Sequence, residues 1–137
     1  MKKLSILFSL VASVALFYAF KSKDEKFSII GKWNGKDKTG SMIINFLPDG
    51  HYEMIQEGKV QKSDEKMELT YKFDNTHSPA WLDLIMTLKA EKPIVMGMEG
   101  IVNVIDNNTL KANFGTKERP NEFAGPKVTD FKRIIEK

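Results

Sequence analysis

The sequence contains no cysteine, so disulfide bonds and thiolate ligands contribute nothing to its stability. It also lacks a strong excess of one charge. Without Lys2 and Lys3, the 21 Lys and Arg fall to 19, against 18 Asp and Glu. A nucleic-acid-binding protein needs a concentrated basic face to neutralise phosphates, so we expect no nucleic-acid partner. No long helical pattern separates the apolar runs after residue 26. Parallel βαβ crossovers are therefore excluded.

The single long hydrophobic run lies at the N-terminus. Met1-Lys2-Lys3 precedes Leu4–Phe20, a stretch of 17 residues without a charge, and charged residues return from Lys21 onwards. This order is typical of a secretory signal. We assign residues 1–26 to a signal peptide or membrane anchor and residues 27–137 to one folded domain. The domain is expected to be periplasmic, secreted, or held on the outer side of the cytoplasmic membrane.

Cleavage of this segment stays open at the level of sequence. Ser13 and Ala15 are small enough to precede a cleavage site, but they leave only a short apolar core. As a helix, residues 4–20 would span about 25 Å, slightly less than the ~30 Å hydrocarbon layer. If the segment is retained, residues 4–20 would contact the membrane, with the flanking lysines reaching its surface.

The rest of the chain shows strand-like runs separated by turn residues. The clearest is Lys66–Asp74, in which apolar and polar residues alternate as on a half-buried strand. Short turns such as Pro48-Asp49-Gly50 favour an antiparallel up-and-down meander. Eight strands close into a barrel that holds its own side chains or one small ligand; an open twisted sandwich is the alternative. The expected strands are 27–34, 41–47, 51–61, 66–74, 80–90, 94–105, 109–114 and 128–135.

A G-x-W motif opens the first of these strands, as Gly31-Lys32-Trp33. At the start of an eight-stranded meander it resembles the lipocalin and wider calycin pattern. In that pattern the Trp plugs one end of the barrel, and an Arg from the last strand packs across its indole. Arg133 is at the matching place, and such a contact is worth about 0.5–2 kcal/mol. The alternative is a core Trp with an unrelated surface Arg.

A broader resemblance covers nearly all of the domain. The spacing of its motifs resembles a family of uncharacterised bacterial lipocalin-like small proteins. The resemblance implies an all-β, lipocalin-like barrel behind an N-terminal hydrophobic helix, and export, but no established activity. The matching segments are Gly31-Lys32-Trp33, Phe46-Leu47-Pro48-Asp49-Gly50, Tyr71-Lys72-Phe73-Asp74, Pro79-Ala80-Trp81-Leu82-Asp83-Leu84, Glu99-Gly100-Ile101, Leu110, Arg119-Pro120-Asn121-Glu122-Phe123 and Phe131-Lys132-Arg133.

The two most conspicuous charged positions of that family fall on Asp83 and Arg119. Asp83 lies in an otherwise apolar strand, and Arg119 precedes a proline in a long loop. One interpretation is a polar grip on a ligand at the barrel mouth. The other, which we favour, is a salt bridge that ties the loop to the barrel wall, because Arg–carboxylate pairs commonly hold loops in place.

No catalytic or metal-binding motif stands out. The sequence has no G-x-S-x-G nucleophile elbow, and His51 and His77 show no His-x-His spacing. We therefore interpret both histidines as surface residues and predict no enzyme, no cofactor and no metal.

The predicted inner face suggests a binding function. We expect an apolar or amphipathic small ligand there, bound by Met54, Met67, Tyr71 and Met86, with Asp83 and Arg119 at the rim. Flexible methionines adapt to irregular guests, and a buried tyrosine needs a hydrogen-bond partner. The alternative is a packed barrel acting as a structural or protein-interaction domain of the cell envelope. The expected inward set is Met42, Ile44, Phe46, Tyr52, Met54, Met67, Leu69, Tyr71, Phe73, Leu82, Leu84, Met86 and Leu88.

Overall fold

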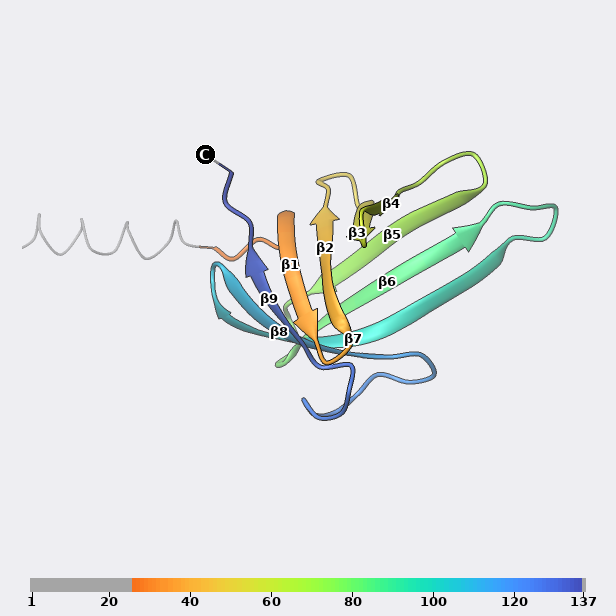
Figure 1. Cartoon of the computed structure of the whole chain (residues 1–137). Coiled ribbons are helices and arrows are strands. Elements are labelled where there is room, and N and C mark those ends of the chain that lie inside the picture. Colours follow the sequence, from red (N-terminus) through yellow and green to blue (C-terminus); the bar gives the residue numbers. More distant parts are fainter. Residues whose placement is uncertain (1–25, 137) are drawn as a thin grey trace, which may run out of the picture.

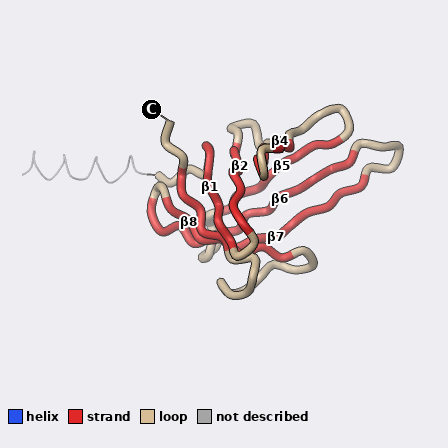
Figure 2. Tube along the Cα trace, viewed as in Figure 1, coloured by secondary structure: helices blue, strands red, loops and turns tan. Residues whose placement is uncertain are grey.

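A computed structural model describes residues 26–136, and all their regular structure is antiparallel β-sheet (Figure 1). Along residues 26–136, strands alternate with loops and turns and no helix lies between them (Figure 2). The nine strands are β1 (Gly31–Asp37), β2 (Gly40–Phe46), β3 (Tyr52–Gln56), β4 (Lys59–Gln61), β5 (Met67–Asp74), β6 (Ala80–Leu88), β7 (Ile94–Asp106), β8 (Thr109–Gly115) and β9 (Thr129–Arg133).

All nine strands belong to one sheet, in the order β4-β3-β2-β1-β9-β8-β7-β6-β5. The first strand pairs with the last, so the beginning and the end of the domain meet in the middle of the sheet. The sheet curls strongly into a half-barrel, and β5, β6 and β7 run on past the shorter strands (Figure 1). The all-β antiparallel prediction is confirmed. The prediction of a closed barrel is wrong, since β4 and β5 remain the two edges.

The half-barrel stays open because the edge of β5 finds other partners. A single bridge, between His51 and Thr70, joins the β3 side to β5. Further along β5, the Leu69 amide donates a hydrogen bond of 2.8 Å to the Ser63 hydroxyl, and the Asp64 amide donates one of 2.8 Å to the Met67 carbonyl. A side chain and a loop thus occupy hydrogen-bonding positions that a neighbouring strand would use in a closed barrel.

The ninth strand comes from a hairpin inside the predicted strand 51–61. Glu57 and Gly58 both have positive φ, 52° and 76°, and they form the two-residue turn between β3 and β4. Positive φ at both central positions suits the tight hairpins that match strand twist. The prediction of eight strands is therefore wrong, because the chain reverses at Gly58, inside the predicted strand 51–61.

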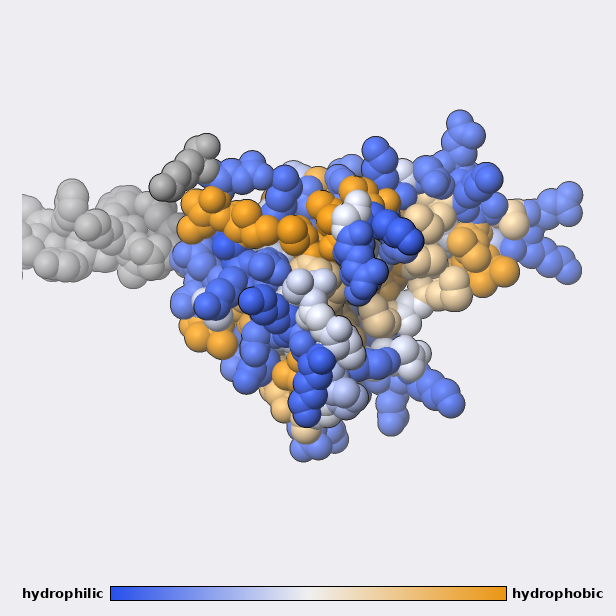
Figure 3. Space-filling view, in the orientation of Figure 1, coloured by the Kyte–Doolittle hydropathy of each residue, from blue (hydrophilic) through white to orange (hydrophobic). Residues whose placement is uncertain are grey.

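The hydrophobic core lies on the concave face of the curled sheet. Every member of the predicted inward set except Leu88 is buried or packs against that core. Gly100 shows how closely this face is packed, because a Cβ there would lie 2.5 Å from the Phe114 ring. On the face of the molecule seen in Figure 3, apolar patches are interrupted by hydrophilic side chains.

The predicted signal or anchor, residues 1–26, lies almost wholly outside the described residues, which begin at Lys26. The expected N-terminal hydrophobic helix falls in the same undescribed part. Within residues 26–136 we find no apolar helix of membrane-spanning length.

Candidate functional site

One end of the half-barrel is filled by aromatic side chains around Trp33. The Trp33 side chain is fully buried, and its indole N–H donates a hydrogen bond of 2.8 Å to the Ile29 carbonyl. The Phe27 ring lies 6.1 Å from the Trp33 ring and 5.8 Å from the Phe73 ring, measured between centroids. This end is therefore packed with aromatic side chains, and the indole N–H, the one polar group of the Trp33 side chain, is paired.

Arg133 makes the contact with Trp33 that we expected from the sequence. Its guanidinium carbon lies 4.2 Å from the centroid of the Trp33 ring. The same group donates hydrogen bonds to the carbonyls of Ser28, Ile30 and Asn107, at 2.6, 2.8 and 3.0 Å. A rigid fork of donors can satisfy three carbonyls at once, whereas a lysine could not reach them in this geometry. Arg133 thus ties the chain before β1 to the β7–β8 turn.

The open part of the concave face contains a cleft of about 550 Å³. Its floor and walls come from β3, β6 and the first half of β7, and Thr116 borders it at the start of the loop after β8. The lining is largely apolar and carries no charged side chain; it consists of Tyr52, Leu84, Met86, Val95, Met96, Gly97, Met98 and Thr116. This volume is in the range of small-molecule sites.

The two tyrosines of the concave face differ in the surroundings of their hydroxyl groups. The Tyr71 hydroxyl donates a hydrogen bond of 2.8 Å to the Leu47 carbonyl, and the Tyr71 ring packs edge-on against Phe46. The protein itself therefore supplies the partner of this hydroxyl. Tyr52 lines the cleft and is nearly buried, and burial raises the pKa of its hydroxyl above the usual 10. Its proton therefore stays in place at neutral pH, and Tyr52 is the better placed of the two to donate to a ligand.

The structure brings only part of the predicted ligand set to the cleft. Met86 lines it, whereas Met54 and Met67 lie elsewhere on the same concave face and pack against the core. Asp83 alternates along β6 with the buried Leu82 and Leu84, so it points to the outer face. Arg119 joins Asp83 there. The predicted rim charges are thus separated from the cleft by the sheet.

On the outer face, Asp83 and Arg119 tie the long loop to the wall. Arg119 Nη1 lies 2.7 Å from Asp83 Oδ1 and donates to the Gly100 carbonyl at 2.7 Å. Asp83 Oδ1 is buried and lies within ion-pair distance of Arg119. Within the described residues, no donor is oriented to give it a hydrogen bond. Asn113 also holds the loop, donating to the carbonyls of Glu122 and Ala124. This arrangement matches the loop-tying interpretation.

Aromatic stacking extends this attachment. The Arg119 guanidinium carbon lies 4.3 Å from the centroid of the Trp81 ring, and the His77 ring stacks on Trp81 at 3.4 Å with an interplanar angle of 7°. The loop begins at Thr116, three residues before Arg119, and Thr116 borders the cleft on the other face. The outer contacts therefore help to position one wall of the cleft.

His51 lies between two carboxylates at the only bridge between β3 and β5 in residues 26–136. Its Nε2 is 2.9 Å from Glu68 Oε1, and its Nδ1 is 3.2 Å from Asp49 Oδ1. The hydrogen bond to Glu68, followed by that to Asp49, raises the pKa of His51 above the usual 6.5. Because the two carboxylates contact different ring nitrogens, they flank the imidazole and do not converge on a common ion.

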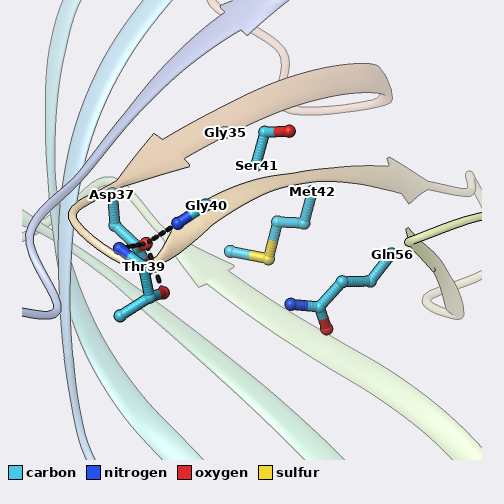
Figure 4. A pocket seen from close by; sticks show the side chains of 7 residues that line it. All are labelled: Gly35, Asp37, Thr39, Gly40, Ser41, Met42 and Gln56. Atoms are coloured by element: carbon cyan, nitrogen blue, oxygen red, sulfur yellow. Dashed lines mark hydrogen bonds between the residues drawn. The ribbon is translucent and has the colours of Figure 1, made fainter.

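Asp37 lies beside a hollow that is too small to hold a ligand. The hollow in Figure 4, near the β1–β2 turn, has a volume of only about 20 Å³, which is room for about one water. Asp37 at its side is satisfied by Thr39 and the Gly40 amide. No group of three or more His, Asp or Glu side chains in the described part of the chain is arranged to hold a metal ion.

Our sequence reasoning missed Met96, Met98 and Thr116 as cleft residues. Met96, Met98, Val102 and Val104 alternate in the sequence as an inward face would, and this alternation was the signal that could have placed the two methionines in the cleft. In the structure β7 is continuous from Ile94 to Asp106, with an irregularity only between Val104 and Asp106.

Comparisons with known proteins add no further assignment. No protein-family model matches the sequence, and no curated protein and no solved structure matches it. The expected lipocalin-like resemblance is therefore supported only at a coarser level, as an all-antiparallel and strongly curled sheet.

Proposed function

We propose that this protein is an exported binding module that takes a small apolar or amphipathic ligand in the cleft of its concave face. The observation that carries the proposal is the cleft itself, about 550 Å³ of space on the same face as the core. A sheet that served only as a packed scaffold would fill this face with its own side chains.

The lining chemistry supports an apolar guest with a polar end. Three methionines provide unbranched, polarisable surface that adapts to irregular shapes. Tyr52 and Thr116 supply hydroxyl groups near the apolar walls. A few polar groups on a mainly apolar lining are what ligand pockets use to orient their ligands. The absence of a charged lining residue favours a neutral ligand, or one whose charge stays in solvent.

A second candidate, a protein-interaction domain, rests on the first half of β7. Ile94, Val95 and Met96 are all about half exposed or more, and β8 pairs with β7 only from Glu99 onwards. An apolar strand with one unpaired edge can accept another strand by backbone hydrogen bonds. In that case the exposed edge, and not the cleft, would be the functional surface.

The binding of an environment-sensitive apolar dye to the full chain separates the two candidates. We expect one saturable site that Met86→Trp blocks, because the larger ring fills the cleft from β6. Val60→Trp is the matched control, since Val60 is 55% exposed on β4 and lies outside the cleft lining. Any dye held by the hydrophobic N-terminus would be common to all three proteins. Equal binding by the wild type and Met86→Trp, with both folded, would reject the proposed ligand site.

A further inference from the structure

All methionines of the described chain lie on the same face of the sheet. The sequence has seven methionines, and the six that follow Met1 each share a strand face with residues of the buried core. Five of the six pack against that core, and Met96 is 48% exposed. The six are Met42, Met54, Met67, Met86, Met96 and Met98.

Three of these side chains line the cleft together. Met86 on β6 and Met96 on β7 are directly opposite each other in the register, and Met98 follows on the same face, opposite Leu84. Opposed residues of antiparallel strands have Cβ atoms about 4.5–5.5 Å apart, and diagonal neighbours about 7–8 Å. Each methionine has three rotatable bonds, so three thioether sulfurs at these spacings can turn toward one point.

The chemistry of this cluster is selective. Thioether sulfur is a soft, neutral donor, and it suits soft cations such as Cu(I), whereas carboxylates and carbonyls suit Mg²⁺ and Ca²⁺. No carboxylate, imidazole or thiolate lines the cleft, so nothing in its lining favours a hard or borderline divalent ion. Met96 reaches solvent and gives an ion a way in.

We propose that Met86, Met96 and Met98 form a binding site for one soft monovalent cation of the Cu(I) type. The site goes beyond the proposed apolar ligand, because it depends on sulfur atoms and not on the free volume of the cleft. Thioethers carry no proton to lose, so binding is independent of pH over the range in which the protein stays folded.

The test uses Ag(I), a redox-stable soft cation, titrated into the full chain in chloride-free buffer. We expect native mass spectrometry to show one Ag(I) per chain. The combined variant Met86→Leu, Met96→Leu and Met98→Leu should bind Ag(I) at least tenfold more weakly, since leucine keeps the volume but lacks sulfur. Met67→Leu is the matched control, from the same face but outside the cleft, and it should bind like the wild type.

A second measurement keeps the test independent of the triple variant's stability. The ε-methyl NMR resonances of Met86, Met96 and Met98 should shift on Ag(I) addition to the wild type, and those of Met42 and Met54 should not. Met96→Leu alone, at the most exposed of the three positions, should also weaken binding. Unshifted cleft resonances, or equal Ag(I) affinity in the folded triple variant, would overturn the proposal.

The two proposals for the cleft fail separately. The triple Leu variant keeps an apolar lining, so it should retain dye binding while it loses Ag(I). Dye binding without Ag(I) binding would leave only the apolar-ligand site, and Ag(I) binding without dye binding would leave only the cation site.

Discussion

At the scale of single residues, Trp33 and Arg133 form a pair whose polar groups are well supplied with hydrogen-bond partners. The indole is fully buried, its N–H is paired, and the guanidinium above it donates to three carbonyls from two separate segments. A pair that combines burial with charge-assisted hydrogen bonds is costly to break from either side.

Replacing Trp33 by Ala should lower the free energy of unfolding by about 3–5 kcal/mol, as for other large buried aromatics. Chemical denaturation measures the loss. Trp81→Ala is the control, because Trp81 is 38% exposed on the outer face, and its loss should be much smaller. Equal losses at the two positions would mean that the packing around Trp33 is wrongly described.

His51 gives the molecule a pH-dependent contact. Its pKa is raised in the folded state, chiefly by the hydrogen bond to Glu68 and then by that to Asp49. A group with a raised folded-state pKa contributes stability that is fully present below its unfolded pKa, about 6.5, and lost as the pH rises through the folded value.

We therefore expect His51→Gln to destabilise the protein most below about pH 6.5, with the difference shrinking as the pH rises through the folded-state pKa of His51. Unfolding curves of wild type and variant across this range measure the effect. His77→Gln is the matched control, since His77 stacks on Trp81 and lies outside the β3–β5 bridge. A difference that grows with pH would contradict the assignment.

At the scale of elements, the loop between β8 and β9 depends on the outer wall of the sheet. Arg119 contacts Asp83, Gly100 and Trp81, and Asn113 holds two further carbonyls of the loop. Part of the outer face beneath this loop is buried, and Ile101 and Asn113 are the buried residues there. They also explain why a charged residue lies in the apolar strand β6.

Arg119→Ala should release this loop without unfolding the sheet. Limited trypsin digestion should then cut faster after Lys117, and circular dichroism should stay unchanged. Lys111→Ala is the control, because its contact with Asp130 is long, 3.9 Å, and exposed. Unchanged cleavage in Arg119→Ala would show that the ion pair does not hold the loop, and would return Asp83 and Arg119 to consideration as a polar site.

At the scale of the whole molecule, the half-barrel combines one packed end with one open end. Trp33 and its neighbours fill the packed end, and the long strands β5, β6 and β7 extend the concave face beyond it (Figure 1). Core packing thus stabilises the fold at one end, and the cleft is left free for binding at the other. The proposed binding function would use this division between a packed core and an accessible cleft.

Export is a prediction from the first 30 residues alone. Fused to a reporter that is active only outside the cytoplasm, residues 1–30 should produce activity, because Lys2 and Lys3 precede an uncharged run of 17 residues. Leu10→Arg within that run should abolish the activity, since a charge in the apolar core opposes insertion. A silent wild-type fusion would reject export by this segment and remove export from the proposed function.

The sequence by itself determined the features that depend on neighbouring residues. Alternation predicted the faces of β5 and β6, and turn residues predicted most strand ends. The contact of Trp33 with Arg133 joins the first and last strands, and it was predicted from the resemblance to the lipocalin pattern. The tertiary structure alone decided whether the sheet closes and which methionines line the cleft together. The closure depends on Ser63 and Asp64 taking hydrogen bonds along β5, and the meeting of Met86 with Met96 depends on the register of β6 and β7. Closure and register both depend on which distant segments pair with each other. A local sequence pattern does not predict this pairing, because side-chain periodicity gives the faces of a strand but not its partner.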